Sequence, residues 1–260
     1  MVLEKIISAR KNRKHPLNIF LMSFLISIIS IFISYTVFKQ NTGLFTVVLI
    51  SLVMVPFMNN MLFYEEIETE ETGEKEPFFK RHGDVISAYV AVFCGMVFAM
   101  SVAFVALPQN LVEIIFQEQI NEVKLIQGKF SFGNQFLDIL TNNISVLMLA
   151  FLFSFLLGTG AVLIIAWNAS VLSAAIGLIA NNLGGLRGMP IAVMAFIPHG
   201  TFELTAYFIS AIAGGLLSVA VTRKKSKNFW YIIKDSFFMM ILAIIFIIIG
   251  AIIETFIIIM

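Results

Sequence analysis

The chain has 260 residues, of which 59% are hydrophobic and 13% are charged. Because soluble domains usually carry about 25% charged residues, this composition excludes a water-soluble globule, and the apolar runs leave no room for a sizeable soluble domain. The formal net charge of +1 excludes broad electrostatic attraction to nucleic acid. We therefore expect an all-α fold, a polytopic transmembrane helical bundle of about six or seven spans, in which residues 1–260 form a single integral membrane domain among membrane lipids.

The first apolar run, 17–38, follows a segment rich in lysine and arginine. A signal peptide also begins with basic residues, but its apolar part is only about 7–15 residues long. The run here is longer, and no A-x-A-like cleavage site follows it. We therefore expect it to be retained as the first span.

Further apolar runs of about 20 residues indicate more spans. Four of them are clear: 43–64, 85–107, 144–166 and 235–258. The stretch 169–221 is harder to interpret, because it holds a short apolar piece (169–184), then Arg187, and then a longer run that is interrupted by Pro198-His199-Gly200. Proline lacks a backbone donor and glycine tolerates unusual dihedral angles, so we expect one broken helix near 198–200 and a new span over about 201–221.

The basic segments predict the orientation. Lysine and arginine in short loops stay on the cytoplasmic side of a membrane, so the basic N-terminus and the cluster 223–227 are both expected there. An even number of crossings must then separate them, which means that 169–221 crosses twice or not at all. Two crossings suit its length and give seven spans, in a multi-pass protein of the cell membrane with a cytoplasmic N-terminus. The short piece 169–184 could instead be re-entrant, which would change the number of spans.

Two segments between the spans are polar. The segment 65–84 holds seven glutamates followed by Lys80-Arg81-His82, and we interpret it as an acidic, solvated cytoplasmic loop, with a docking or ion-binding role as the alternative. The segment 108–142 is expected to lie outside the membrane on the other side. Its apolar residues alternate with glutamates, a pattern typical of an amphipathic helix on the membrane surface or against the bundle.

Small residues recur at helical spacing in several spans, and in lipid such residues let helices approach closely. The ladders are Ser23/Ser27/Ser30/Ser34, Gly95/Ala99/Ala103, Ala150/Ser154/Gly158 and Ser210/Gly214/Ser218. They predict one compact bundle in which the ladders pack within the chain. The alternative is that one face is left for a partner copy, which would give a homo-oligomer. The single cysteine, Cys94, lies in an apolar run and is expected to be a small buried packing residue.

Three ionisable residues lie within apolar runs: His199, Glu203 and Glu254. A charge at the centre of a bilayer costs about 2.5–3.5 kcal/mol on insertion scales, so each needs a partner or water. The predicted topology places all three on the outer side, together with Asn142 and Asn143. One hypothesis is an outward-facing polar pocket for a substrate, ion or partner; the alternative is that Arg187, His199 and the glutamates neutralise one another.

A set of short motifs resembles the stage II sporulation protein M (SpoIIM) family over about residues 135–222. The motifs are Asn142-Asn143, Gly158-Thr159-Gly160, Asn168 and Pro198-His199-Gly200-Thr201-Phe202-Glu203-Leu204. The family often shows Asn-Gly after the fourth span, whereas Ala169 follows Asn168 here. The resemblance implies a multi-spanning membrane protein without known catalytic chemistry. It also implies partner proteins, because relatives in spore-forming bacteria join a membrane complex with peptidoglycan-degrading proteins, although many relatives occur in organisms that never sporulate.

Three functions compete. The one that we expect from the sequence is a non-catalytic scaffold or component of a membrane complex, and the others are alternatives. The second is a transporter or channel with an intramembrane polar site around His199 and Glu203, although no inverted repeat is evident. An enzyme is disfavoured, because the chain lacks G-x-S-x-G, H-E-x-x-H and Walker motifs. No cofactor or metal is expected either, since His199 and Glu203 make only two potential ligands at i, i+4 on a predicted break.

Overall fold

The computed structural model describes residues 15–72, 78–129, 135–222 and 229–259. Within this part of the chain, every regular element is helical, and seven helices are long and apolar enough to cross a membrane. This confirms the predicted all-α bundle. The seven are α3 (Pro16–Val37), α4 (Thr42–Thr72), α5 (Phe78–Ala106), α8 (Gln135–Leu157), α9 (Ala161–Asn182), α10 (Met189–Thr222) and α11 (Phe229–Ile259).

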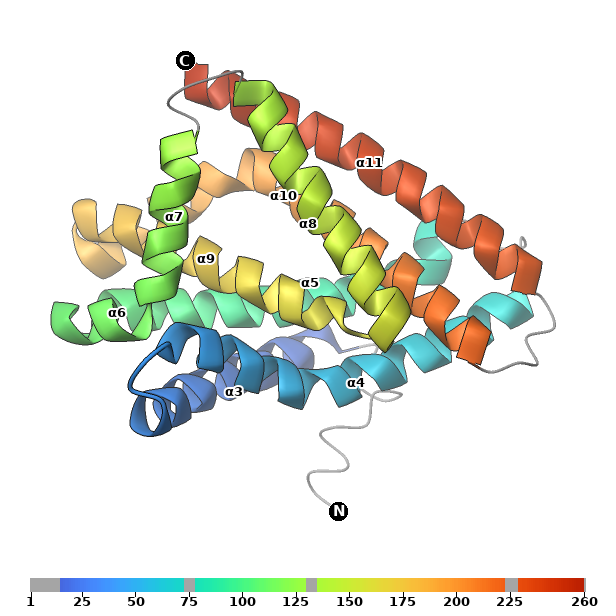
Figure 1. Ribbon diagram of the computed structural model, residues 1–260, viewed down its shortest axis with the longest axis horizontal. Helices are drawn as coiled ribbons and strands as arrows, with labels where there is room; N and C mark the ends of the chain where they lie inside the picture. The colour runs from blue at the N-terminus through green and yellow to red at the C-terminus, as the bar shows by residue number, and fades with distance from the viewer. Residues whose placement is uncertain (1–14, 73–77, 130–134, 223–228, 260) are drawn as a thin grey trace.

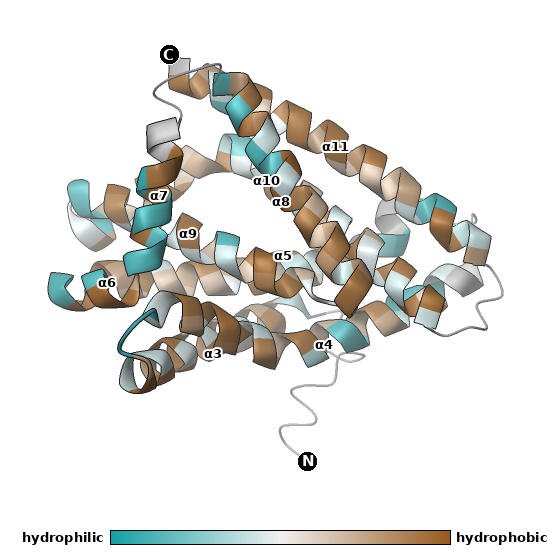
Figure 2. Ribbon diagram, in the orientation of Figure 1, coloured by the Kyte–Doolittle hydropathy of each residue, from teal (hydrophilic) through white to brown (hydrophobic). Residues whose placement is uncertain are grey.

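The spans form two neighbouring groups (Figure 1). Helices α3, α4, α5 and α9 lie side by side, and α8, α10 and α11 pack against one another as the second group. Hydrophobic residues run along the lengths of the spans, whereas hydrophilic ones gather mainly toward helix ends and on two short helices (Figure 2). This distribution is the one expected of helices whose middle parts are surrounded by lipid.

Serine and glycine create the close contacts between spans. The serine face of α3 is buried, as the ladder predicted, and Ser23 donates its hydroxyl to the Val92 carbonyl on α5 at 2.7 Å. On α5, a methyl group added to Gly95 would lie 2.9 Å from Cβ of Ser23. Gly214 on α10 approaches Ser154 on α8 in the same way, at 3.0 Å. These residues therefore let backbones pack together where lipid supplies no hydrophobic force between helices.

A glycine turn moves two helix boundaries away from the predicted ones. Gly158 has φ +74°, a left-handed conformation that ends α8 at Leu157, and α9 begins at Ala161. Helix α8 therefore lies two to three turns earlier in the chain than the predicted fourth span, 144–166. The predicted short piece 169–184 is in fact the second half of α9, a helix of 22 residues, so the structure does not require a re-entrant segment.

The predicted break near Pro198-Gly200 was also wrong. Helix α10 is continuous from Met189 to Thr222 with Pro198 inside it, and it bends along its length (Figure 1). Proline within a helix removes one backbone donor and is a common cause of bends. Gly200 lies in this continuous helix and lacks a positive φ, so its backbone does not require glycine. Because the helix does not break, His199 and Glu203 lie on one face, one turn apart.

The acidic segment 65–84 is largely helical rather than a loop. Helix α4 extends to Thr72 and α5 begins at Phe78, and both Glu65 and Glu66 are buried. The prediction of a solvated loop was therefore wrong for these residues, while Glu74 and Glu76 lie outside the described residues. The two basic segments that predict the orientation, at the N-terminus and at 223–227, also lie outside the described residues.

The predicted amphipathic segment forms α6 (Gln109–Ile115) and α7 (Gln117–Lys129). Val112 and Val123 are buried, whereas Glu113 and Lys124 are exposed. Helix α7 runs across the ends of the spans (Figure 1) and packs against α9 and α4. Glu118 on α7 accepts a hydrogen bond from the backbone N–H of Gly43 at 3.2 Å. This segment therefore covers one end of the bundle.

Candidate functional site

A cavity of about 690 Å³ lies within the bundle, lined by residues of α3, α5, α7, α8, α9, α10 and α11. Most of its lining is apolar, with polar side chains concentrated where α8, α10 and α11 meet. The sequence-predicted site residues on its wall are Asn142, Asn143, Asn168, His199, Gly200, Glu203 and Glu254. The cavity therefore brings together predicted site residues from distant parts of the chain, such as Asn142 and Glu254, which are 112 positions apart.

His199, Glu203 and Glu254 form a compact group that we call the cavity cluster. One donor atom from each side chain lies within 4.8 Å of the others. His199 and Glu203 come from successive turns of α10, and Glu254 comes from α11, which packs alongside. Nδ1 of His199 is buried and has no hydrogen-bond partner within the described part of the chain.

Glu203 is held by the Asn143 amide, which Tyr207 in turn orients. Asn143 on α8 donates its amide N–H to Oε1 of Glu203 at 2.7 Å. Tyr207, one turn after Glu203 on α10, donates its hydroxyl to the carbonyl oxygen of Asn143 at 2.8 Å. The Tyr207 hydroxyl thereby fixes which end of the Asn143 amide faces Glu203. Asn142 also contacts Asn143, at a longer 3.4 Å.

Gly250 on α11 makes room for the cavity cluster. A methyl group at this position would lie 2.7 Å from Cγ of Glu203 and 3.4 Å from the carbonyl oxygen of His199. Any larger residue would therefore push α10 and α11 apart at this level, so the glycine permits the approach that brings Glu254 to Glu203.

Neither glutamate of the cavity cluster takes part in an ion pair among the described residues, and the basic residue of the cluster is His199, whose ring lies within 4.8 Å of both. Arg187, which the sequence offered as a neutralising partner, lies exposed in the 3₁₀ turn Gly185–Arg187. Mutual neutralisation with Arg187 was therefore wrong. Two carboxylates this close repel each other in a medium of low dielectric constant unless a proton or a cation lies between them.

Three sequence-predicted site residues do not line the cavity. Gly158 and Gly160 form the turn between α8 and α9, and their neighbour Thr159 donates its hydroxyl to the Val55 carbonyl at 3.2 Å. Pro198 is an exposed residue of α10. Conversely, Cys94 is not the buried packing residue that we expected: it is exposed and lines the cavity.

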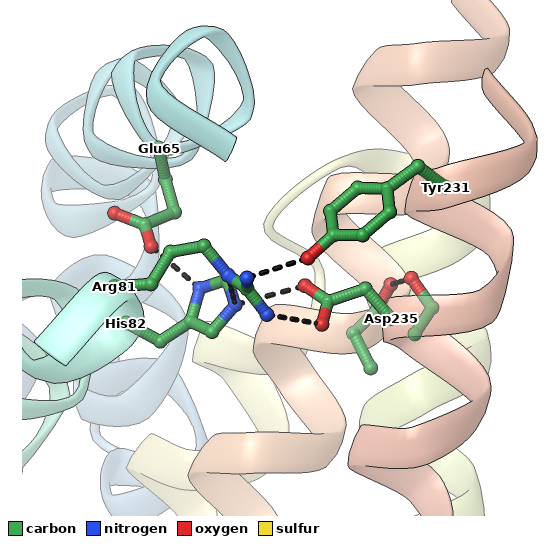
Figure 3. Close-up of polar contacts among 7 residues, drawn as sticks. Glu65, Arg81, His82, Tyr231 and Asp235 are labelled. Carbon is green, nitrogen blue, oxygen red and sulfur yellow. Dashed lines mark hydrogen bonds and ion pairs between the residues drawn. The ribbon is translucent and has the colours of Figure 1, made fainter. Parts of the chain in front are cut away.

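A second polar cluster joins α4, α5 and α11, and we call it the ion-pair network (Figure 3). The guanidinium of Arg81 donates to the Tyr231 hydroxyl at 2.5 Å and to Oδ1 of Asp235 at 2.6 Å. The ring of His82 lies between two carboxylates, with Nδ1 2.6 Å from Glu65 and Nε2 2.9 Å from Asp235. The four ionisable side chains are at most 7% exposed.

Its pairing makes the ion-pair network a structural feature. Asp235 pairs with both Arg81 and His82, and Glu65 pairs with His82. Buried charges are tolerated when they are paired and hydrogen-bonded, and removing one partner leaves the other uncompensated. The network therefore ties the ends of α4 and α5 to the beginning of α11.

A family model described as Stage II sporulation protein M matches residues 86–257, which is more than half of the chain. The chain belongs to the SpoIIM family. No curated protein and no solved structure matches it. The SpoIIM match is wider than the 135–222 of the sequence resemblance. It includes every residue of the cavity cluster together with Asn143 and Tyr207, whereas Glu65, Arg81 and His82 precede it.

Sequence reasoning missed several residues of this SpoIIM protein, although some signals were present. Tyr207 follows Glu203 by four positions, and Gly250 precedes Glu254 by four, so each shares a helical face with an acidic residue. The ion-pair network had a weaker signal. Its charged residues lie near the ends of apolar runs, where charge ordinarily faces water, and their partners are up to 154 positions away.

Proposed function

We propose that this SpoIIM family protein is a non-enzymatic transporter or channel that binds a small cationic solute in the cavity. The observation that carries the proposal is the pair of carboxylates, Glu203 and Glu254, which face a cavity of about 690 Å³ and take part in no ion pair among the described residues. Ionisable residues within membrane spans usually mark pathways for ions or substrates. A cation in the cavity would remove the repulsion between the two carboxylates.

Side chains on the cavity wall, rather than a break in the α10 backbone, support transport. A broken helix near Pro198 would have resembled the discontinuous helices of many transporters, but α10 is continuous. What supports the proposal is the convergence of α8, α10 and α11 on one polar wall in an otherwise apolar cavity. The lack of catalytic sequence motifs supports the non-enzymatic part.

Flux into liposomes tests this function. Purified protein should carry at least one cation from a panel of H⁺, Na⁺, K⁺, Mn²⁺, Co²⁺ and small organic amines into vesicles. Glu203→Gln should abolish that flux, because it removes a charge from the cavity cluster without changing the side chain's size. The matched control is Glu113→Gln, at an exposed position on α6, which should carry the cation at the normal rate. Absence of flux for the whole panel, or equal loss in both variants, would contradict the proposal.

A membrane-complex component is the second candidate function. Membership of the SpoIIM family supports it, as does the exposed surface of α7, which presents Lys124 and Leu125 at one end of the bundle. In that case the partners are other membrane proteins or further copies of this chain. Affinity purification from gently solubilised membranes should recover a partner that a Lys124→Glu/Leu125→Glu variant loses. Recovery of the chain alone as a monomer would count against this candidate.

A further inference from the structure

The cavity cluster offers the ligand set of a metal ion. His199, Glu203 and Glu254 present one imidazole nitrogen and two carboxylate oxygens within 4.8 Å of one another. Donors bound to one zinc-sized ion lie at most about 4 Å apart, because each bond is about 2.0–2.2 Å long. Small shifts of these side chains therefore bring all three into coordination range. The sequence alone did not show this set, since its third member comes from another helix.

Charge balance favours a divalent ion over a monovalent one. Two carboxylates and a neutral imidazole carry a charge of −2, which a divalent cation cancels completely and a monovalent cation cancels only by half. Residual charge is expensive at membrane depth. The nitrogen donor narrows the choice further, because Mg²⁺ and Ca²⁺ prefer oxygen ligands, whereas imidazole suits zinc-like transition metals.

The surroundings of the cluster resemble the outer shell of a metal site. Metal-binding carboxylates are usually oriented by hydrogen bonds from neighbouring groups. Asn143 supplies such a bond to Oε1 of Glu203, and the Tyr207 hydroxyl fixes the Asn143 amide. On His199, Nδ1 is buried without a hydrogen-bond partner among the described residues. A buried ring nitrogen without a partner is costly, and a metal–nitrogen bond would satisfy it.

We infer that His199, Glu203 and Glu254 bind one divalent transition-metal ion of the zinc class, with Asn143 and Tyr207 orienting the Glu203 ligand. Three protein ligands leave at least one coordination position open, and here it faces the cavity, so that water completes the shell. Such a site exchanges its ion more readily than a closed structural site. The metal site itself is argued from its three ligands, and only the identification of this ion as the transported solute rests on the proposed function.

Cobalt spectroscopy tests the site directly. Protein freed of its affinity tag and stripped with a chelator is titrated with Co²⁺ in detergent, and the visible absorption bands of bound cobalt are followed. We expect one Co²⁺ per chain, displaced by Zn²⁺ but not by equal concentrations of Mg²⁺ or Ca²⁺. Bands from sulfur-to-cobalt charge transfer should be absent, which separates this site from binding at Cys94. Failure of the wild-type protein to bind Co²⁺ in this ratio, or displacement by Mg²⁺ or Ca²⁺, would overturn the inference.

Graded variants then assign the ligands. Tyr207→Phe, which removes only the orienting hydroxyl, should weaken Co²⁺ binding by about 10–100-fold. Glu254→Gln removes a direct ligand and should weaken it by more than about 100-fold. Glu113→Gln should bind like wild type. If Glu254→Gln fails to fold, the wild-type titration and Tyr207→Phe still decide, and unchanged affinity in Tyr207→Phe would contradict the assigned orienting role.

The site and the transport function can fail separately. Stoichiometric Co²⁺ binding without flux of any cation of the panel in liposomes would keep the metal site and overturn transport. Flux of another cation that depends on Glu203, without Co²⁺ binding, would keep transport and overturn the metal site.

Discussion

At the level of single residues, the Tyr207 hydroxyl orients Asn143, and Asn143 holds one oxygen of Glu203. The sequence could predict that His199, Glu203 and Glu254 need partners, because charge inside an apolar run is conspicuous. It could not predict which partners they find, since Asn143 lies 60 positions from Glu203. Glu65 and Asp235 were hidden for the opposite reason: each lies near a helix end, where an acid usually meets water.

Asp235 should be the acid on which folding depends most, because both Arg81 and His82 pair with it. Replacing Asp235 with Asn removes the carboxylate that pairs with both Arg81 and His82, and breaking a buried ion pair typically costs about 3–5 kcal/mol. Unfolding of the purified protein in detergent, followed by circular dichroism, measures the change. Asp138→Asn, at an exposed position in the first turn of α8, is the control and should cost at most about 1 kcal/mol. Equal losses in the two variants would show that the network contributes nothing special.

Cys94 gives a chemical view of the cavity, since it is the only cysteine in the chain and lines the cavity wall. A small water-soluble thiol reagent should modify it in the folded protein, because the cavity must admit water if it binds a cation. A bound Co²⁺ ion should slow the reaction by restricting entry. Mass spectrometry of the intact protein measures the extent, and a thiol that reacts only after unfolding would mean that water does not reach this part of the wall.

At the level of helices, apolar length predicted five spans, because each must cover the hydrocarbon thickness, and the even number of crossings required between the two basic segments brought the total to seven. The boundaries were harder to predict. Gly158-Thr159-Gly160 lies inside a continuous apolar stretch, so the left-handed turn at Gly158 has no hydropathy signal. Pro198-His199-Gly200 misled in the other direction, since a helix packed against neighbours on several sides can hold a proline and a glycine without ending.

Substitutions of Gly250 and Gly200 test two different roles of glycine, close packing between helices and interruption of a helix. Gly250→Ala places a methyl group against Glu203 and the His199 backbone, and overpacking of this kind costs about 1–3 kcal/mol. Gly200 has no neighbouring atom within 4 Å of an added methyl group, so Gly200→Ala should be neutral or stabilise the helix by up to about 1 kcal/mol. Thermal unfolding of the two variants in one detergent compares them. A large loss for Gly200→Ala would mean that α10 needs a glycine backbone there after all.

At the level of the whole molecule, seven crossings are expected to place the beginning of α3 and the end of α11 on opposite sides of the membrane. The described helices agree with this alternation: α7 contacts the beginning of α4 and packs on α9, while the ion-pair network joins the end of α4, the beginning of α5 and the beginning of α11. The sequence predicts which side is which only through its basic segments.

The predicted orientation can be tested with single cysteines introduced into a Cys94→Ser chain. Lys124→Cys on α7 should react in intact cells with a maleimide that cannot cross membranes, because α7 is expected outside. Thr222→Cys, at the end of α10, should react only after the cells are opened. Both positions are exposed, so burial does not explain a difference. The reverse pattern would invert the predicted orientation and place His199, Glu203 and Glu254 toward the cytoplasmic side.

Helix α11 carries one acid of each polar cluster, Asp235 near its beginning and Glu254 near its end, about 28 Å apart at about 1.5 Å per residue. Between them, much of its surface is bare hydrocarbon-facing isoleucine and phenylalanine, which bilayer tails accommodate equally well in any position. The opposite face of α11 is buried between the two acids, and α11 packs against α10, so the helix links the two polar clusters. A shift of α11 caused by loss of the Asp235 pairs would therefore carry to Glu254, and Asp235→Asn should weaken Co²⁺ binding although Asp235 is not a ligand.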